Sequence, residues 1–398
     1  TVNPLSLPVR SIYGDLDALA LAAMPQMHPN RLAVQTEAML SSWHGQLPRA
    51  ERLFERASGL GLAPRDVANY RAANAIYDGD APYANQLART ALAVDPESIR
   101  AEKLVEQARR MLRPRVSFVP RWWSDNADRS YAEYKLQFST HVRENLAATF
   151  HVSDITWRDD ENTQHGRGVG VGLRYYPFKQ HWLDLTVGAV LRDGNGENGA
   201  GFGQWGASWR GAYATDTLNL NGIYTVTYNR ESIETGQSIE EGIYADRLAF
   251  SSQARFLNWG VLETEVYGVS RTGGNKTVGM TLSPLYILWD KPQIRVGYLF
   301  GMADSDHNPQ EYYAPQEYIN HMAIASAQYE IFDGVSLRGM VGYGTAKTKS
   351  KDWEQVVRYN TQINWKASDD WNFNATYQRL ELPAYTMDQF SLGVQYIF

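Results

Sequence analysis

The C-terminal part of the chain alternates between apolar and polar side chains. Counting back from the last residue in steps of two gives Phe398, Tyr396, Val394, Leu392 and Phe390. The positions between them are small or polar, apart from Ile397. Successive side chains of a β-strand point to opposite faces, so this pattern predicts a strand with one apolar face and one face suited to water. Such a strand is typical of the wall of an outer-membrane β-barrel.

The same alternation recurs upstream, and about sixteen segments of this kind can be counted over residues 116–398. Clear examples cover the ranges 133–138, 169–175, 183–191, 205–210, 357–365 and 371–378. An even number of antiparallel strands is what a bacterial single-chain barrel requires. Polar residues at every second position predict a wet interior. Sixteen tilted strands give a backbone diameter on the order of 30 Å, which leaves room for an aqueous channel.

The expected connections between these strands fall into two classes. Short connections follow even-numbered strands, at 143–146, 177–181, 333–334 and 367–370. Long connections follow odd-numbered strands, at 159–168, 193–201, 230–242, 303–318 and 347–354. Outer-membrane barrels combine short periplasmic turns with longer extracellular loops. This asymmetry predicts that the chain enters the barrel from the periplasmic side.

Helical periodicity replaces the alternation in the first part of the chain. Apolar spacing predicts helices over residues 12–24, 31–43, 48–58, 64–77, 82–94 and 96–112. Several of these ranges begin at a proline, which is favoured in the first turn of a helix. The helical pattern ends at Arg113-Pro114-Arg115. We therefore expect a connector over residues 1–10, helical repeats over 11–113 and a transmembrane barrel over 114–398.

Part of the helical region repeats at a spacing of 34 residues. Trp43 returns as Tyr77 and Gly45 as Gly79, and three further matches are Ala50 with Ala84, Leu53 with Leu87, and Ala57 with Ala91. A helix–turn–helix unit of this length resembles the tetratricopeptide (TPR) repeat. Two units are clear, which predicts the end of a longer array. A plain helical bundle is the alternative.

Composition fits a barrel better than helical membrane spans. No stretch of about 18 apolar residues occurs, whereas the chain has 24 Tyr, 12 Trp and 32 Gly. Its 398 residues exceed one ordinary soluble core. The absence of cysteine excludes disulfides and thiolate metal sites, and the net charge of −6 disfavours binding to nucleic acid. Because the sequence begins with Thr1 rather than Met, we expect a mature product or part of a longer protein.

Charged side chains suggest a path for a solute. The expected loops carry the acidic residues Asp159, Asp160, Glu161, Glu231, Glu234, Glu240, Glu241, Asp304, Asp306, Glu311 and Glu317. The expected inner wall is mixed, with Glu133, Asp184, Glu263, Glu265 and Glu330 against Lys135, Arg174, Arg210, Arg247, Arg255, Arg295 and Arg338. An acidic mouth would attract a cationic solute. Alternatively, the loop acids are ordinary solvated charges, and the wall arginines are structural partners of the carboxylates.

Aromatic side chains on the same wall could contact sugar rings. If Trp123, Tyr176 and Tyr267 point inward, they offer flat faces to a sugar or simply fill space. Catalysis has little support. His151 and Ser153 share a strand face, but Asp154 points to the other side, and triads are recognised by geometry rather than adjacency. The sequence predicts no enzyme, no metal site and no cofactor.

The order of the two regions resembles that of the outer-membrane exporters of bacterial exopolysaccharides. This group includes the exporters of Pel, of poly-N-acetylglucosamine and of cellulose. Within it, RVSFVPRWWSD (115–125) and DQFSLGVQYIF (388–398) are most similar to the PelB-like exporters of Pel. The resemblance is architectural and covers most of the chain.

The resemblance implies export of a long polysaccharide for the biofilm matrix. It implies TPR-like repeats in the periplasm that dock a deacetylase or hydrolase, together with a PelC-like lipoprotein ring as a further partner. Pel is a partly deacetylated, cationic polymer, which agrees with the acidic loops, whereas the mixed wall departs from a simple acidic tunnel. Another polysaccharide, or a diffusion porin with general or selective passage, is the alternative.

Overall fold

The computed structural model describes residues 29–43, 45–159, 163–193, 202–215, 220–233, 235, 238, 242–256, 259–290, 292–309, 312–383 and 385–398. The chain forms two compact units. The first comprises residues 1–113 together with 178–181 and 212–222, and the second comprises the rest of the strand region. The expected helix at 12–24 lies outside the described residues.

The first unit contains five described helices: α2 (Pro29–Trp43), α3 (Leu47–Gly59), α4 (Pro64–Asp78), α5 (Ala81–Val94) and α6 (Ile99–Leu112). Proline occupies the first turn of α3, α4 and α5, as the sequence predicts. Helix α6 begins three residues later than expected, because Ser98 rather than Pro96 caps its first turn. None of the described helices is long and apolar enough to cross a membrane.

Buried small residues hold consecutive helices together. Ala50 and Ala84, which are 34 residues apart, both have no exposed surface, and the same is true of Ala57 and Ala91. Gly79 ends α4 in the left-handed conformation with φ of 82°, which a residue with a Cβ rarely adopts. The repeat observed in the sequence therefore matches repeated burial in the structure. Membership of the TPR class stays a prediction.

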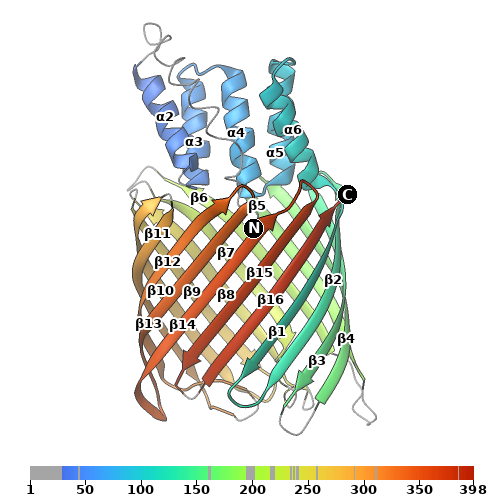
Figure 1. Cartoon of the computed structure of the whole chain (residues 1–398), viewed down its shortest axis with the longest axis vertical. Helices are drawn as coiled ribbons and strands as arrows, with labels where there is room; N and C mark the ends of the chain where they lie inside the picture. The colour runs from blue at the N-terminus through green and yellow to red at the C-terminus, as the bar shows by residue number, and fades with distance from the viewer. Residues whose placement is uncertain are drawn as a thin grey trace. The chain divides into compact units, whose positions relative to one another are not determined.

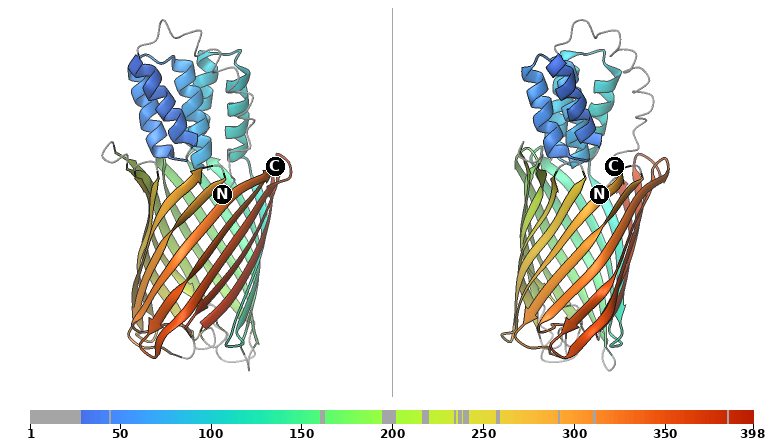
Figure 2. Two further views of the ribbon diagram at one scale, coloured as in Figure 1. Left: turned by 60° about the vertical axis from the view of Figure 1, so that its left-hand side comes forward. Right: turned by 90° about the vertical axis from the view of Figure 1, so that its left-hand side faces the viewer.

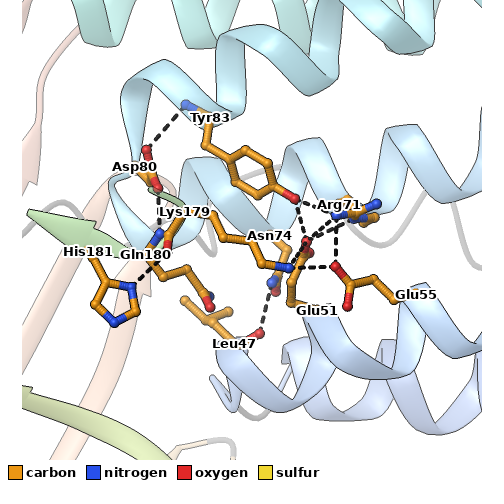
Figure 3. A network of polar contacts seen from close by, with 10 residues as sticks. All are labelled: Leu47, Glu51, Glu55, Arg71, Asn74, Asp80, Tyr83, Lys179, Gln180 and His181. Carbon is orange, nitrogen blue, oxygen red and sulfur yellow. Dashed lines mark hydrogen bonds and ion pairs between the residues drawn. The ribbon is translucent and has the colours of Figure 1, made fainter. Parts of the chain in front are cut away.

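A polar network lies inside the first unit (Figure 3). The carboxylate of Glu51, which is 2% exposed, accepts hydrogen bonds from Arg71 Nε at 2.8 Å and from the Tyr83 hydroxyl at 2.6 Å. Burial, and then the neighbouring Glu51 carboxylate, raise the pKa of the Tyr83 hydroxyl. Three elements, α3, α4 and α5, are thus joined by one charged group.

The turn at residues 178–181 belongs to this same unit (Figure 3). The backbone N–H of Gln180 donates to Asp80 Oδ2 at 2.7 Å, and the Lys179 ammonium pairs with Glu55. Arg52 of α3 also donates to the carbonyl of Ala214 at 2.6 Å. This bond joins the segment 212–222 of the first unit to α3. The first unit is therefore assembled from residues far apart in the sequence.

The second unit is a closed antiparallel barrel (Figures 1 and 2). Its sixteen strands, counted over the described residues, are β1 (Arg115–Asp125), β2 (Ser130–Arg143), β3 (Leu146–Arg158), β4 (Thr163–Phe178), β5 (His181–Asp193), β6 (Phe202–Ala214), β7 (Asn221–Ser232), β8 (Tyr244–Phe256), β9 (Gly260–Arg271), β10 (Lys276–Asp290), β11 (Gln293–Ser305), β12 (Tyr318–Phe332), β13 (Val335–Thr348), β14 (Lys351–Lys366), β15 (Trp371–Leu382) and β16 (Tyr385–Ile397). Strand β1 closes the barrel against β16, with Val116 opposite Tyr396. Closure removes the exposed edges that an open sheet would have.

One face of the barrel wall is apolar and exposed. On neighbouring strands, Leu136 lies opposite Val152, and Val152 lies opposite Val169. These side chains are 48%, 41% and 41% exposed. Apolar side chains in such a continuous exposed band face lipid in a membrane barrel, so the alternate residues of each strand face the lumen. Inward glycines make room for large neighbours: a Cβ on Gly166 would lie 2.8 Å from the Trp157 ring.

The connections agree only in part with the expected asymmetry. The turns after β2, β4 and β12 are short, as predicted, and lie at the near end, where β1 begins; each spans two residues. At the far end, the connections after β5, β7 and β11 are long. The expected long loop at 347–354 is wrong, because β13 runs to Thr348 and β14 starts at Lys351. The loop expected at 159–168 is also shorter, because strand pairing extends to Arg158 and Thr163.

Candidate channel lumen

The strand alternation determines which charged side chains line the lumen. All the wall residues predicted from the sequence lie on the face opposite the exposed apolar band: Glu133, Asp184, Glu263, Glu265, Glu330, Lys135, Arg174, Arg210, Arg247, Arg255, Arg295 and Arg338. Arg121, Arg271 and Arg358 share that face and were not singled out from the sequence. The alternation of period two along their strands could have identified them as inward residues. The described inward positions named here carry more basic than acidic groups.

Most of the inward carboxylates are paired with arginine or lysine. Arg174 binds Asp184 through two hydrogen bonds of 2.5 and 3.0 Å, a bidentate geometry. Glu133 pairs with Lys135 at 2.9 Å, and Glu265 pairs with Arg247. In these pairs the basic side chains are structural partners of the carboxylates, which is the alternative that the sequence left open for the wall arginines. The remaining positive charge is what a solute in the lumen would meet.

Aromatic side chains add flat surfaces to the inner wall. Trp182 has the guanidinium of Arg210 4.0 Å from its ring centroid and that of Arg174 at 5.4 Å, which are cation–π distances. Of the three predicted aromatics, Trp123 is partly exposed and stacks on Tyr131 at 6.1 Å. Tyr176 is only 8% exposed, so it acts mainly as packing.

The interior is not polar throughout, although the alternation predicted a wet lumen. On β9–β14 a cluster of inward side chains is buried: Val261, Leu285, Ile287, Leu299, Met322, Ile324, Ala346 and Val356. Val261 and Val356 have no exposed surface. Tyr318 and Leu382 pack against this cluster. A layer of apolar packing therefore thickens this part of the wall. Period-two patterns show which face a residue lies on, but they do not show what covers it.

Two of the predicted loop acids have structural partners. Asp304 lies within β11 on the outward face, and its carboxylate accepts the N–H of Glu317 at 2.9 Å. Asp306 accepts the N–H of Lys276 at 3.0 Å. The reading of Asp304 as a loop residue beside the solute path is therefore wrong, because strand pairing extends through Ser305.

The other predicted acids are placed as follows. Asp159 is partly buried next to the end of β3, and Glu231 is exposed near the end of β7. Glu317 is exposed, with a positive φ of 51°. The remaining acids lie outside the described residues: Asp160, Glu161, Glu234, Glu240, Glu241 and Glu311.

The histidine and serine considered for catalysis lie against glycines of β4. A Cβ on Gly170 would meet His151 at 2.3 Å, and one on Gly168 would meet Ser153 at 2.3 Å. Asp154 lies on the opposite face of β3, as expected, and is exposed. These three side chains therefore do not converge.

No protein-family model and no curated protein matches the chain. Among solved structures, one described as "Bacterial polysaccharide outer membrane secretin" is similar with a TM-score of 0.59 and 10% identity, covering 72% of this chain and 99% of that chain. OccK11 (OpdR) of Pseudomonas aeruginosa has a TM-score of 0.38 and 12% identity, covering 71% of this chain and 95% of that chain. At such identities the likeness concerns the fold alone. The chain has the fold of an outer-membrane β-barrel.

Proposed function

We propose that this protein is a passive channel in the bacterial outer membrane, and that it exports a secreted polysaccharide. The observation that carries the proposal is the division of the barrel wall into an apolar outer face and a charged inner face. Sixteen strands enclose enough space for a hydrated chain to pass. The barrel of similar fold described as a polysaccharide secretin supports the choice of polysaccharide. The protein supplies a path, not a reaction.

For the polymer itself, we propose the cationic amino-sugar polymer Pel. The architectural resemblance to PelB-like exporters and the acidic residues in the sequence of the long connections support this choice. In this proposal the far end is extracellular, and the helical unit lies in the periplasm. There it docks a deacetylase or hydrolase and a PelC-like lipoprotein ring.

The excess of inward arginine favours a second candidate, export of an acidic polysaccharide. Among the inward residues named above, ten side chains are basic and five are acidic; the basic ones include Arg121, which pairs with Glu133 at 3.5 Å, and also Arg210 and Arg358. Guanidinium groups bind carboxylates and sulfates through paired hydrogen bonds. The sign of the polymer's charge therefore separates the two candidates.

Reconstitution in planar bilayers tests the proposal. The purified chain is inserted, and the current is recorded with glucosamine oligomers or with uronic-acid oligomers of equal length. Block by the amino-sugar oligomers, weakened by Glu263→Gln with Glu265→Gln, supports Pel. Stronger block by the uronic-acid oligomers, weakened by Arg210→Gln, supports the acidic candidate. A current that no oligosaccharide changes contradicts both candidates.

A further inference from the structure

One segment at the far end of the barrel contacts two walls that lie nearly opposite each other. The Tyr312 ring lies 4.9 Å from the guanidinium of Arg271, at the end of β9. The next residue, Tyr313, stacks on Tyr385, the first residue of β16, with ring centroids 4.7 Å apart. Strands β9 and β16 are seven steps apart around one side of the sixteen-strand barrel and nine around the other. Consecutive side chains therefore reach across the mouth.

Both wall contacts lie on the lumen side. Arg271 is five positions from Val266, which is 53% exposed on the outward face, so the two side chains point to opposite faces of β9. Tyr385 is likewise five positions from the outward Phe390. Strand pairing is regular between Tyr385 and Phe390, so no bulge changes this assignment.

The segment 312–317 is held in place by further contacts. Tyr312 is 6% exposed and Ala314 is 1% exposed. Asn275, itself 1% exposed, lies between β9 and β10, and its amide donates to the Tyr312 hydroxyl at 3.1 Å and to the carbonyl of His307 at 3.0 Å. The carbonyl of Gln316 accepts the N–H of Lys349 at 2.9 Å. Such low exposure and so many bonds describe a packed element.

We propose that Tyr312 and Tyr313 set the width of the channel at its far end, and so determine the size of solute that passes. Neither residue was singled out from the sequence. Their side chains occupy the cross-section that the barrel backbone would otherwise leave open. The inference rests on the proposed channel function, but it concerns size and not the chemistry of the polymer.

Conductance in simple salt tests this assignment. Tyr312→Ala with Tyr313→Ala is expected to raise the single-channel conductance on the order of twofold, because conductance follows the open cross-section of the barrel. The size limit for neutral polyethylene glycols should rise with it. Tyr343→Ala is the matched control, because Tyr343 is 55% exposed on the outward face. Unchanged conductance and size limit in the double variant overturn the proposal.

A cross-linking experiment provides a second arm that does not depend on the folding of the double variant. The chain has no cysteine, so Tyr313→Cys with Tyr385→Cys creates the only two thiols. A short thiol-specific reagent is expected to join them, and Tyr313→Cys with Tyr343→Cys should remain unlinked. Failure to link the first pair in a folded barrel contradicts the crossing. Neither the conductance measurement nor the cross-linking experiment uses a sugar. A negative result in them would therefore contradict the role of the two tyrosines without contradicting the proposed transport of a polysaccharide.

Discussion

The carboxylate of Asp80 accepts two backbone N–H groups, one from Tyr83 and one from Gln180, which lies 100 residues further along the chain than Asp80. Its Oδ1 accepts from Tyr83 at 3.2 Å and caps helix α5, while its Oδ2 accepts from Gln180 at 2.7 Å in the turn between β4 and β5. Asp80 is 1% exposed, so neither bond competes freely with water. The Asp80 side chain therefore caps the first turn of α5 and also binds the turn at residues 178–181, which belongs to the same unit.

Replacing this carboxylate should weaken the first unit more than the loss of an ordinary helix cap. Asp80→Ala removes both bonds and is expected to cost about 2–3 kcal/mol, because it also leaves buried N–H groups without a partner. Ser98→Ala is the matched control: it removes only the cap of α6 and should cost about 1 kcal/mol. Thermal unfolding followed by circular dichroism at the helical minimum measures both. Equal losses would show that the bond to Gln180 adds nothing.

The turn between β12 and β13 should depend on glycine. Gly334 has φ of 77°, and a Cβ there would lie 2.8 Å from the carbonyl oxygen of Lys366. Gly334→Ala is therefore expected to cost about 1–2 kcal/mol, from left-handed strain and this close approach. Gly339→Ala, in the middle of β13 with nothing within 4 Å of the added Cβ, should be nearly neutral. Urea unfolding in detergent compares the two, and a tolerated Gly334→Ala would contradict the geometry.

Ion selectivity should respond to inward charges and not to outward ones. Asp184→Asn leaves the inward guanidinium of Arg174 without its partner and is expected to shift the reversal potential toward anion preference. The control is Asp246→Asn, which breaks the pair with Arg230. Asp246 shares its strand face with the exposed Leu248 and therefore points outward. A shift of equal size in both variants would show that the assignment of faces is wrong.

Alkaline pH should weaken the first unit through Tyr83. Its raised pKa means that the folded state holds the hydroxyl proton more tightly than the unfolded chain, whose tyrosines titrate near pH 10. This contribution is therefore present below about pH 10 and is lost as the pH rises through the folded pKa. Tyr83→Phe should unfold more easily at neutral pH but lose less stability between about pH 9 and 11. Parallel pH profiles for the two proteins would exclude this role.

The barrel could be predicted from the sequence because a period of two is a local property of each strand. The strand faces of Glu133, Asp184 and Arg174 follow from that period alone. The starts of α3, α4 and α5 follow from first-turn prolines in the same way, whereas α6 begins after Ser98 and not at Pro96. Loop lengths could not be predicted in this way: β13 and β14 pair as far as Thr348 and Lys351, which leaves two residues where a long connection was expected at 347–354.

What the sequence could not predict arises from contacts across the fold. The roles of Tyr312 and Tyr313 depend on Arg271 and Tyr385, which are brought together only when the barrel closes. The buried apolar layer around Val261 arises because inward residues of β9–β14 pack on one another. The bond between the buried Asp80 and the N–H of Gln180 could not be predicted either, because the two residues lie 100 positions apart in the sequence.

Single-channel recording of the purified protein shows whether this barrel conducts a hydrated chain. The folded barrel is expected to give discrete conductance steps, and a charged oligosaccharide that enters the lumen should lower the current reversibly. A folded barrel that gives no steps, even after Tyr312→Ala with Tyr313→Ala, would contradict the proposed channel function.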